Sequence, residues 1–125
     1  MNAAPLLTPE LRDNLLSNGR NRDADHVPVV KLFNPVGAAT WLATELDADG
    51  DILFGLADLG FGCPELGSFS LSELESVPLP FGLRIERDHS FRTEHRLSTW
   101  ATAARASGSI AEAERILSAA SRPPG

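Results

Sequence analysis

Apolar residues recur at helical spacing near both ends of the chain and in strand-like runs through its middle. A helix is predicted over residues 9–19, because Thr8 can cap it, Pro9 suits its first turn and Gly19 offers a left-handed stop. The apolar stripe of this helix consists of Leu11, Leu15 and Leu16.

The clearest local pattern is a hairpin over residues 40–59. Two apolar runs, 41–46 and 52–59, flank an aspartate-rich turn, and Asp49-Gly50 favours a two-residue type I′ turn. That turn sets the register of the hairpin. It pairs Leu46 with Leu53, Glu45 with Phe54 and Trp41 with Asp58.

The remaining elements are predicted from prolines, glycines and helix-capping residues. A strand over 26–33 contains Pro28, so it lies at an edge or starts late. Residues 60–67 are predicted as a loop, and 83–91 as a further strand. Capping signals predict three more helices. The first opens at Ser70 with Glu73, and the second is capped by Ser98 and stops at Gly108. The third opens at Ser109 with Glu112, and its apolar stripe consists of Ile110, Ala113, Ile116 and Leu117.

These elements predict an α+β fold, with a mainly antiparallel sheet of about four strands, an N-terminal helix and C-terminal helices. The 125 residues suit one domain, over 1–121, with a flexible tail at 122–125. Cys63 is the single cysteine, so no intramolecular disulfide is possible. The chain shows no secretory signal and no membrane-length apolar run, and we expect a cytoplasmic protein.

Charge is spread unevenly along the chain. The net charge is −6, and residues 32–83 carry eight acids and no Lys or Arg. Nucleic-acid affinity comes largely from Lys and Arg, so this middle stretch disfavours direct nucleic-acid binding. It favours a basic protein partner, or a solvated acidic face that keeps the protein soluble.

The aspartates of the hairpin turn raise the question of a metal. Asp47, Asp49 and Asp51 alternate as in a calcium-binding loop, but Ile52 stands where such a loop needs glycine, and the flanks are strand-like. The histidines lack zinc-site spacing. The sequence therefore predicts a solvated turn, no metal site and no cofactor.

Catalytic signals are weak. Cys63 lies in a glycine-rich loop where a nucleophile could be exposed, although a lone cysteine more often serves as a small buried hydrophobe. His26, Asp58 and Glu65 are the candidates for a small hydrolase or metal-dependent enzyme, which requires them to meet in one cleft.

Charged residues on or beside the predicted strands suggest a polar pocket instead. Lys31, Glu45, Asp58 and Glu86 are its expected members. With the aspartates of the turn they form the predicted binding set: Lys31, Glu45, Asp47, Asp49, Asp51, Asp58 and Glu86.

Several segments together resemble the bacterial family catalogued as domain of unknown function 2958. They are residues 6–11 (LLTPEL), 25–33 (DHVPVVKLF), 39–42 (ATWL), 54–60 (FGLADLG), 64–67 (PELG) and 86–88 (ERD). The resemblance spans about Leu6 to Ala104 and brings no catalytic residues with it. It implies an accessory protein of plasmids and other mobile elements, acting around conjugation, maintenance or evasion of host defences.

The function hypothesis that follows is a non-enzymatic protein-interaction module of a mobile element. It acts through its acidic surface on a basic protein partner, and a counter-defence inhibitor is one concrete version. The enzyme built on His26, Asp58 and Glu65 is the alternative. A subunit that is stable only as an oligomer is the third possibility, since the sequence leaves the oligomeric state open.

Overall fold

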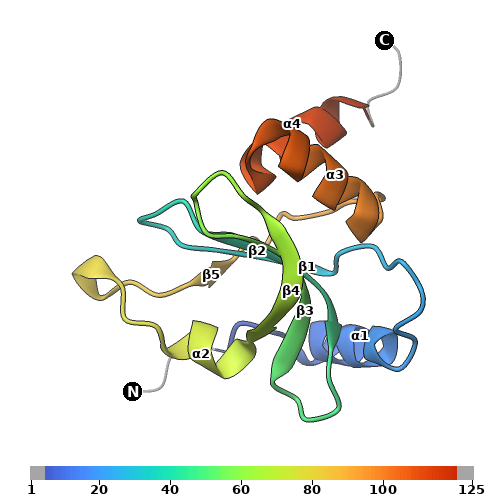
Figure 1. Cartoon of the computed structure of the whole chain (residues 1–125). Helices are drawn as coiled ribbons and strands as arrows, with labels where there is room; N and C mark the ends of the chain where they lie inside the picture. Colours follow the sequence, from blue (N-terminus) through green and yellow to red (C-terminus); the bar gives the residue numbers. More distant parts are fainter. Residues whose placement is uncertain (1–4, 121–125) are drawn as a thin grey trace.

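The computed structural model describes residues 5–120, in which one antiparallel sheet lies at the centre with helices on both faces (Figure 1). The strand order is β4-β3-β2-β1-β5 and every pairing is antiparallel. The strands are β1 Val30–Phe33, β2 Thr40–Leu46, β3 Ile52–Asp58, β4 Glu65–Ser70 and β5 Glu86–Arg87. The predicted α+β class is confirmed, with five strands instead of about four.

The helices divide between the two faces of the sheet. They are α1 Pro9–Gly19, α2 Leu71–Ser76, α3 Leu97–Ser107 and α4 Ile110–Ala120, with a short 3-10 turn, η1, at Pro80–Gly82. The helices α1 and α2 cover an apolar core that contains Leu15, Leu32 and Leu53. On the opposite face, α3 and α4 enclose a second core around Leu42, Leu56 and Trp100.

Local capping signals explain where most helices begin and end. The hydroxyl of Thr8 accepts the Leu11 N–H at the start of α1, and Ser70 and Ser109 cap α2 and α4 in the same way. The helix α3 stops at Gly108, whose φ of 92° is the left-handed conformation that glycine adopts without strain. These boundaries follow the sequence predictions, except at the end of α1. Gly19 is the last residue of that helix and not a left-handed stop, because the C-cap is Arg20 with a φ of −82°. In α4, Ile116 of the predicted stripe is 42% exposed.

The start of α3 differs from its prediction. Ser98 is not the N-cap; it lies in the first turn, and its backbone N–H and hydroxyl both donate to the carboxylate of Asp25. The hydrogen bond from the Ser98 hydroxyl lowers the pKa of Asp25, against the opposing effect of burial. A carboxylate that lies 73 residues earlier in the chain therefore stabilises this helix terminus.

Two further aspartates play the same part. The carboxylate of Asp51 accepts the Ser72 N–H at 2.8 Å at the start of α2, and this hydrogen bond lowers the pKa of Asp51. The carboxylate of Asp58 accepts the Ile110 N–H at 2.9 Å, at the start of α4. Three loop or strand-end aspartates thus satisfy N–H groups of three helices that are distant in sequence.

The hairpin register is confirmed near the turn and wrong farther from it. Leu46 pairs with Leu53 and Glu45 with Phe54, but Trp41 pairs with Ala57, and Asp58 pairs with Thr40. The cause is a β-bulge between Ala43 and Glu45, which adds one residue to β2.

The bulge decides which side chains of β2 reach the core. Strict alternation would place Glu45 beside Ala43 and turn Leu46 away from the α1 side. With Thr44 as the extra residue, Leu46 joins the α1-side core and Glu45 turns to the α3/α4 face. The Leu42 carbonyl oxygen approaches Gly55 so closely that an added Cβ would lie 1.8 Å from it.

The turn itself is not type I′. Gly50 has a φ of 77°, but Asp49 does not adopt positive φ, and the Gly50 N–H donates to the Asp47 carbonyl oxygen. The Asp49 side chain accepts the N–H groups of Asp51 and Ile52 instead. This side-chain bonding stabilises a wider turn with the same register on either side.

Three other boundaries differ from the predictions. The first strand starts late, at Val30, as the proline at position 28 allows, although it lies inside the sheet. The predicted strand over 83–91 shrinks to Glu86–Arg87. The predicted loop over 60–67 ends before Glu65, where β4 begins. This strand was not predicted because its glycine and serines have little preference for strands. The predicted tail at 122–125 lies outside the described residues.

Candidate interaction site

Three of the four residues predicted to share a polar pocket line one cavity. This polar cavity, of about 800 Å³, lies between the β1–β2 loop, β5 and the start of α4, and its walls include Lys31, Asp58 and Glu86. Cross-strand pairing explains the grouping, because Glu86 pairs with Phe33, Phe33 with Thr40 and Thr40 with Asp58. Side chains in register across adjacent strands lie on one face of a sheet.

Two of these three side chains are engaged inside the protein. The ammonium of Lys31 lies 2.7 Å from a carboxylate oxygen of Glu114 and 3.4 Å from one of Asp88. Asp58 is 3% exposed, and its two oxygens accept the N–H groups of Gly60 and Ile110. Glu86 is exposed, and its side chain makes no hydrogen bond or ion pair within residues 5–120. It is therefore the member of the three that is available to a partner.

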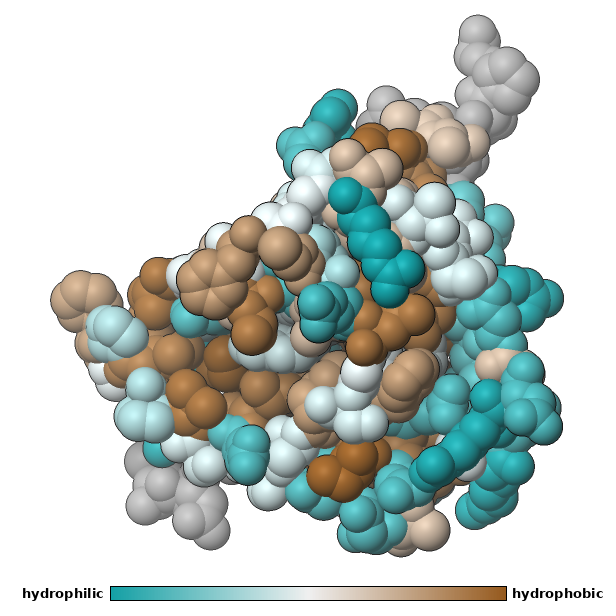
Figure 2. Space-filling view, in the orientation of Figure 1, coloured by the Kyte–Doolittle hydropathy of each residue, from teal (hydrophilic) through white to brown (hydrophobic). Residues whose placement is uncertain are grey.

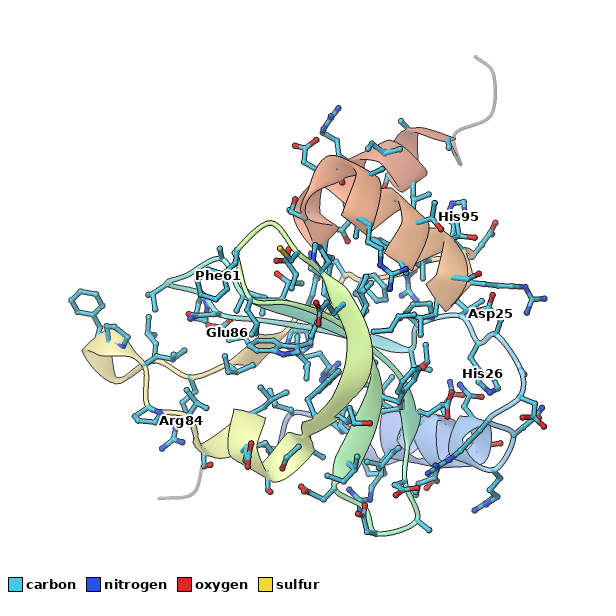
Figure 3. The ribbon with its side chains drawn as sticks, in the orientation of Figure 1. Asp25, His26, Phe61, Arg84, Glu86 and His95 are labelled. Atoms are coloured by element: carbon cyan, nitrogen blue, oxygen red, sulfur yellow. The ribbon has the colours of Figure 1, made fainter. Side chains whose placement is uncertain are left out.

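Exposed apolar side chains stand beside this cavity. Phe61 is 83% exposed, Leu59 57% and Val36 41%, and we call these three residues the apolar rim. Val36 lies in the β1–β2 loop, and Leu59 and Phe61 lie in the β3–β4 loop. The two loops are in contact, since a Cβ on Gly60 would lie 2.9 Å from the Cβ of Ala38, and both loops border the polar cavity. Brown side chains gather on this side of the molecule in Figure 2, and Figure 3 shows Phe61 near Glu86.

No motif or periodicity in the sequence predicts the apolar rim. One signal was present: Phe61 stands between Gly60 and Gly62, both of which adopt positive φ, 91° and 82°. An aromatic residue between two glycines in a tight loop has little local structure to bury it, so its exposure could have been inferred.

The aspartates of the hairpin turn have structural roles. Asp47 forms an ion pair with Arg22, Asp49 bonds to the backbone of its own turn, and Asp51 bonds to Ser70 and the start of α2. Among the described residues, no group of three or more His, Cys, Asp or Glu side chains is arranged to hold a metal ion.

The enzyme hypothesis required His26, Asp58 and Glu65 in one cleft, and the structure separates them. His26 borders a cavity of about 890 Å³ between α1 and the start of α3, Asp58 borders the polar cavity, and Glu65 lies beside Cys63 in a third hollow. Their strands and loops bring them to different parts of the fold. The single catalytic cleft is therefore not formed by these residues.

Cys63 is exposed in the β3–β4 loop, which contradicts the expectation of a buried hydrophobe. Its thiol lies 3.7 Å from the Phe61 carbonyl oxygen, and the hollow that it borders contains Glu65 and Arg105 but no histidine.

Glu45, the fourth predicted pocket residue, lines a separate cleft of about 300 Å³ near the β2–β3 turn. We call it the Glu45 cleft; its other walls are Arg22, Asp47, Ile52, Phe54 and Ser68. Burial raises the pKa of Glu45, while the charges of His26 and Arg22 oppose that rise.

Comparison with known proteins gives one match. The family model described as "Protein of unknown function (DUF2958)" matches residues 6–111. The chain belongs to the DUF2958 family. The match runs from before α1 to the first residues of α4, so it includes the polar cavity, the apolar rim and the Glu45 cleft of this DUF2958 protein. No curated protein and no solved structure matches the chain.

Within the described part of the chain, no helix has the length and apolar character needed to cross a membrane.

Proposed function

We propose that this DUF2958 protein is a non-enzymatic protein-interaction module that binds its partner through the apolar rim and the adjoining polar cavity. The observation that carries the proposal is the exposure of Phe61, Leu59 and Val36 on two adjoining loops. Single exposed apolar residues are ordinary, but a group of them beside polar side chains is typical of a protein-binding surface. Buried aromatic anchors supply much of the affinity in such interfaces.

Charge specifies the chemistry of the partner. All three rim residues belong to the 32–83 stretch, which has eight acids and no Lys or Arg. This stretch offers no cation to the phosphates of nucleic acid or of anionic lipid, and of the bases that line the polar cavity Lys31 is paired with Glu114 and Asp88 while Arg87 donates to the Leu6 carbonyl oxygen. Exposed carboxylates at Glu65 and Glu86 border the same loops. A partner that offers an apolar contact surrounded by Lys and Arg complements this surface.

A basic, nucleic-acid-binding face of a host protein has that chemistry. In the finer version of the proposal, the protein belongs to a bacterial mobile element, acts in the cytoplasm and covers such a face as a counter-defence inhibitor. The support for this version is the base-free stretch of residues 32–83 together with the resemblance of the sequence to plasmid-associated proteins.

The test compares Phe61→Ser with Ile116→Ser, a matched control on α4, where Ile116 is 42% exposed. Tagged wild-type and variant proteins would be used for capture from host lysate at low and high salt, with mass spectrometry of the retained proteins. We expect one partner whose retention falls at high salt and with Phe61→Ser but not with Ile116→Ser. Equal retention by both variants would refute the apolar rim as the interface.

Cys63 provides a second readout with no engineered residue. It is exposed and is the only cysteine, two residues from Phe61. Its alkylation rate should fall when the captured partner is bound. An unchanged rate would place the partner elsewhere on the protein.

A further inference from the structure

The Glu45 carboxylate is held in an unusual setting by the β-bulge. The bulged residue, Thr44, donates its hydroxyl to the Phe54 carbonyl oxygen at 3.2 Å, and its own carbonyl accepts the Asn18 side-chain N–H at 2.9 Å. These bonds fix the backbone that turns Glu45 to the α3/α4 face, opposite Phe54. Glu45 is only 9% exposed.

The Glu45 carboxylate has no hydrogen-bonded or ion-paired partner among the described side chains, although the charges of His26 and Arg22 act on it from farther away. Within residues 5–120, the side chain of Glu45 forms no hydrogen bond and no ion pair. Arg22, the nearest cation on the wall of the cleft, is paired with Asp47 instead. The side chain of Glu45 is mostly buried while its carboxylate opens into the cleft, so a cation that enters the cleft meets an acceptor that has no hydrogen-bond donor inside the described protein.

The walls of the Glu45 cleft match one kind of ligand group. Because Asp47 is paired with Arg22, Glu45 carries the unpaired charge of the cleft and disfavours an anion, and the Ser68 hydroxyl can accept or donate a hydrogen bond. Phe54 supplies an aromatic ring, which attracts a cation placed over its face. The cleft, at about 300 Å³, suits the end of one side chain better than a nucleotide or a large cofactor.

We infer that the Glu45 cleft binds an arginine guanidinium supplied by the basic partner, with Glu45 as its carboxylate acceptor. A planar guanidinium pairs with a carboxylate through two parallel hydrogen bonds and stacks on an aromatic ring, which suits this set of groups better than an ammonium does. The origin of the arginine rests on the proposed function, whereas the affinity of the cleft for guanidinium does not.

The test is an amide-resolved NMR titration of the full chain with N-acetyl-arginine amide. The corresponding lysine and citrulline amides serve as comparison probes, since citrulline keeps the shape of arginine without its charge. We expect shifts at the amides of Glu45, Phe54 and Ser68 with the arginine probe, weaker shifts with the lysine probe and none with the citrulline probe. Equal responses to the arginine and citrulline probes, or no response in the cleft, would overturn the inference.

Glu45→Gln removes the charge and preserves the shape. We expect it to weaken binding of the arginine probe about tenfold, whereas Glu73→Gln, which removes an exposed acid on α2, should leave the affinity unchanged. Arg22→Gln should strengthen binding because it removes a competing cation from the cleft. Wild-type affinity in Glu45→Gln, or weaker binding in Arg22→Gln, would overturn the inference.

These titrations use a small probe at the Glu45 cleft and do not involve the apolar rim. A failed titration with a Phe61-dependent partner would therefore refute the guanidinium site alone. A successful titration with no such partner would refute the proposed function alone.

Discussion

Replacing Asp58 should reveal how strongly a single carboxylate holds α4 on the sheet. Asp58→Ala removes both acceptors, so the N–H groups of Ile110 and Gly60, each 2.9 Å from an Asp58 oxygen, lose their partners. The bond to Ile110 is buried and charge-assisted, and its loss should cost about 2–3 kcal/mol. Gly60 lies in an exposed loop where water can replace the carboxylate, so its loss should cost about 1 kcal/mol.

The expected loss in the free energy of unfolding is therefore about 3–4 kcal/mol for Asp58→Ala. That loss is a large fraction of the about 5–15 kcal/mol available to a typical domain. Asp58→Asn should cost about half as much, because its carbonyl oxygen keeps one acceptor while its amide faces the other N–H. Urea unfolding, followed by the fluorescence of the buried Trp41 and Trp100, measures both. A loss below about 1 kcal/mol for Asp58→Ala, or equal losses for Ala and Asn, would refute this account of Asp58.

Three other substitutions test the hairpin, the Glu45 carboxylate and the contact of Asp25 with α3. Gly55→Ala should cost about 3 kcal/mol or more in urea unfolding, because its Cβ would lie 1.8 Å from the Leu42 carbonyl oxygen; Gly67→Ala, with no atom within 4 Å of its Cβ, is the control. Glu45→Gln should be more stable than the wild type at pH 7. The pKa of Glu45 is raised in the folded protein, so the wild type loses stability as pH rises through that folded-state pKa. The difference between the two proteins should vanish below about pH 4.5, the ordinary pKa of a glutamate, where the carboxyl is protonated in both the folded and the unfolded wild type. Asp25→Asn should show the opposite sign, with a deficit at pH 7 that shrinks as pH falls through the lowered pKa of Asp25; urea unfolding between pH 3 and pH 8 checks both.

The sequence predicts those parts of the fold that short-range chemistry determines. Thr8, Ser70 and Ser109 lie within three residues of the N–H groups they cap, so their roles are visible in the local pattern. The register of the hairpin next to its turn is likewise local. The strand β4 was missed because its glycine and serines carry little strand preference, and pairing with β3 stabilises it instead.

The bulge in β2 lies beyond such local reasoning. Thr44 has no sequence signal for a bulge, and the extra residue shifts the pairing of everything before it, which is why Trp41 was assigned to Asp58. The bulge puts Glu45 on the same face of the sheet as Lys31 and Glu86, but Glu45 lies at the turn end of β2, whereas the polar cavity lies at the other end, beside Thr40. Distance along β2, and not the face of the sheet, therefore divides the predicted pocket into two sites.

Helix capping across long sequence distances changes the meaning of the acidic middle. Asp51 and Asp58 belong to the base-free stretch, yet both bond to helix N–H groups, and Asp47 is paired with Arg22. Their charges contribute to the fold and are partly neutralised by helix dipoles or by arginine. The raw excess of acids along residues 32–83 therefore overstates the charge that a partner meets.

The acids that remain for a partner are those without a contact inside the protein. Glu86 beside the apolar rim and Glu45 in its cleft have this property, and they lie at separate cavities on the α3/α4 face. A partner that contacts both must present an apolar centre and at least two cations far enough apart to reach the two cavities. Salt sensitivity of binding should then depend on Glu45 and Glu86, while removal of Asp47 should act mainly through Arg22 and the stability of the turn.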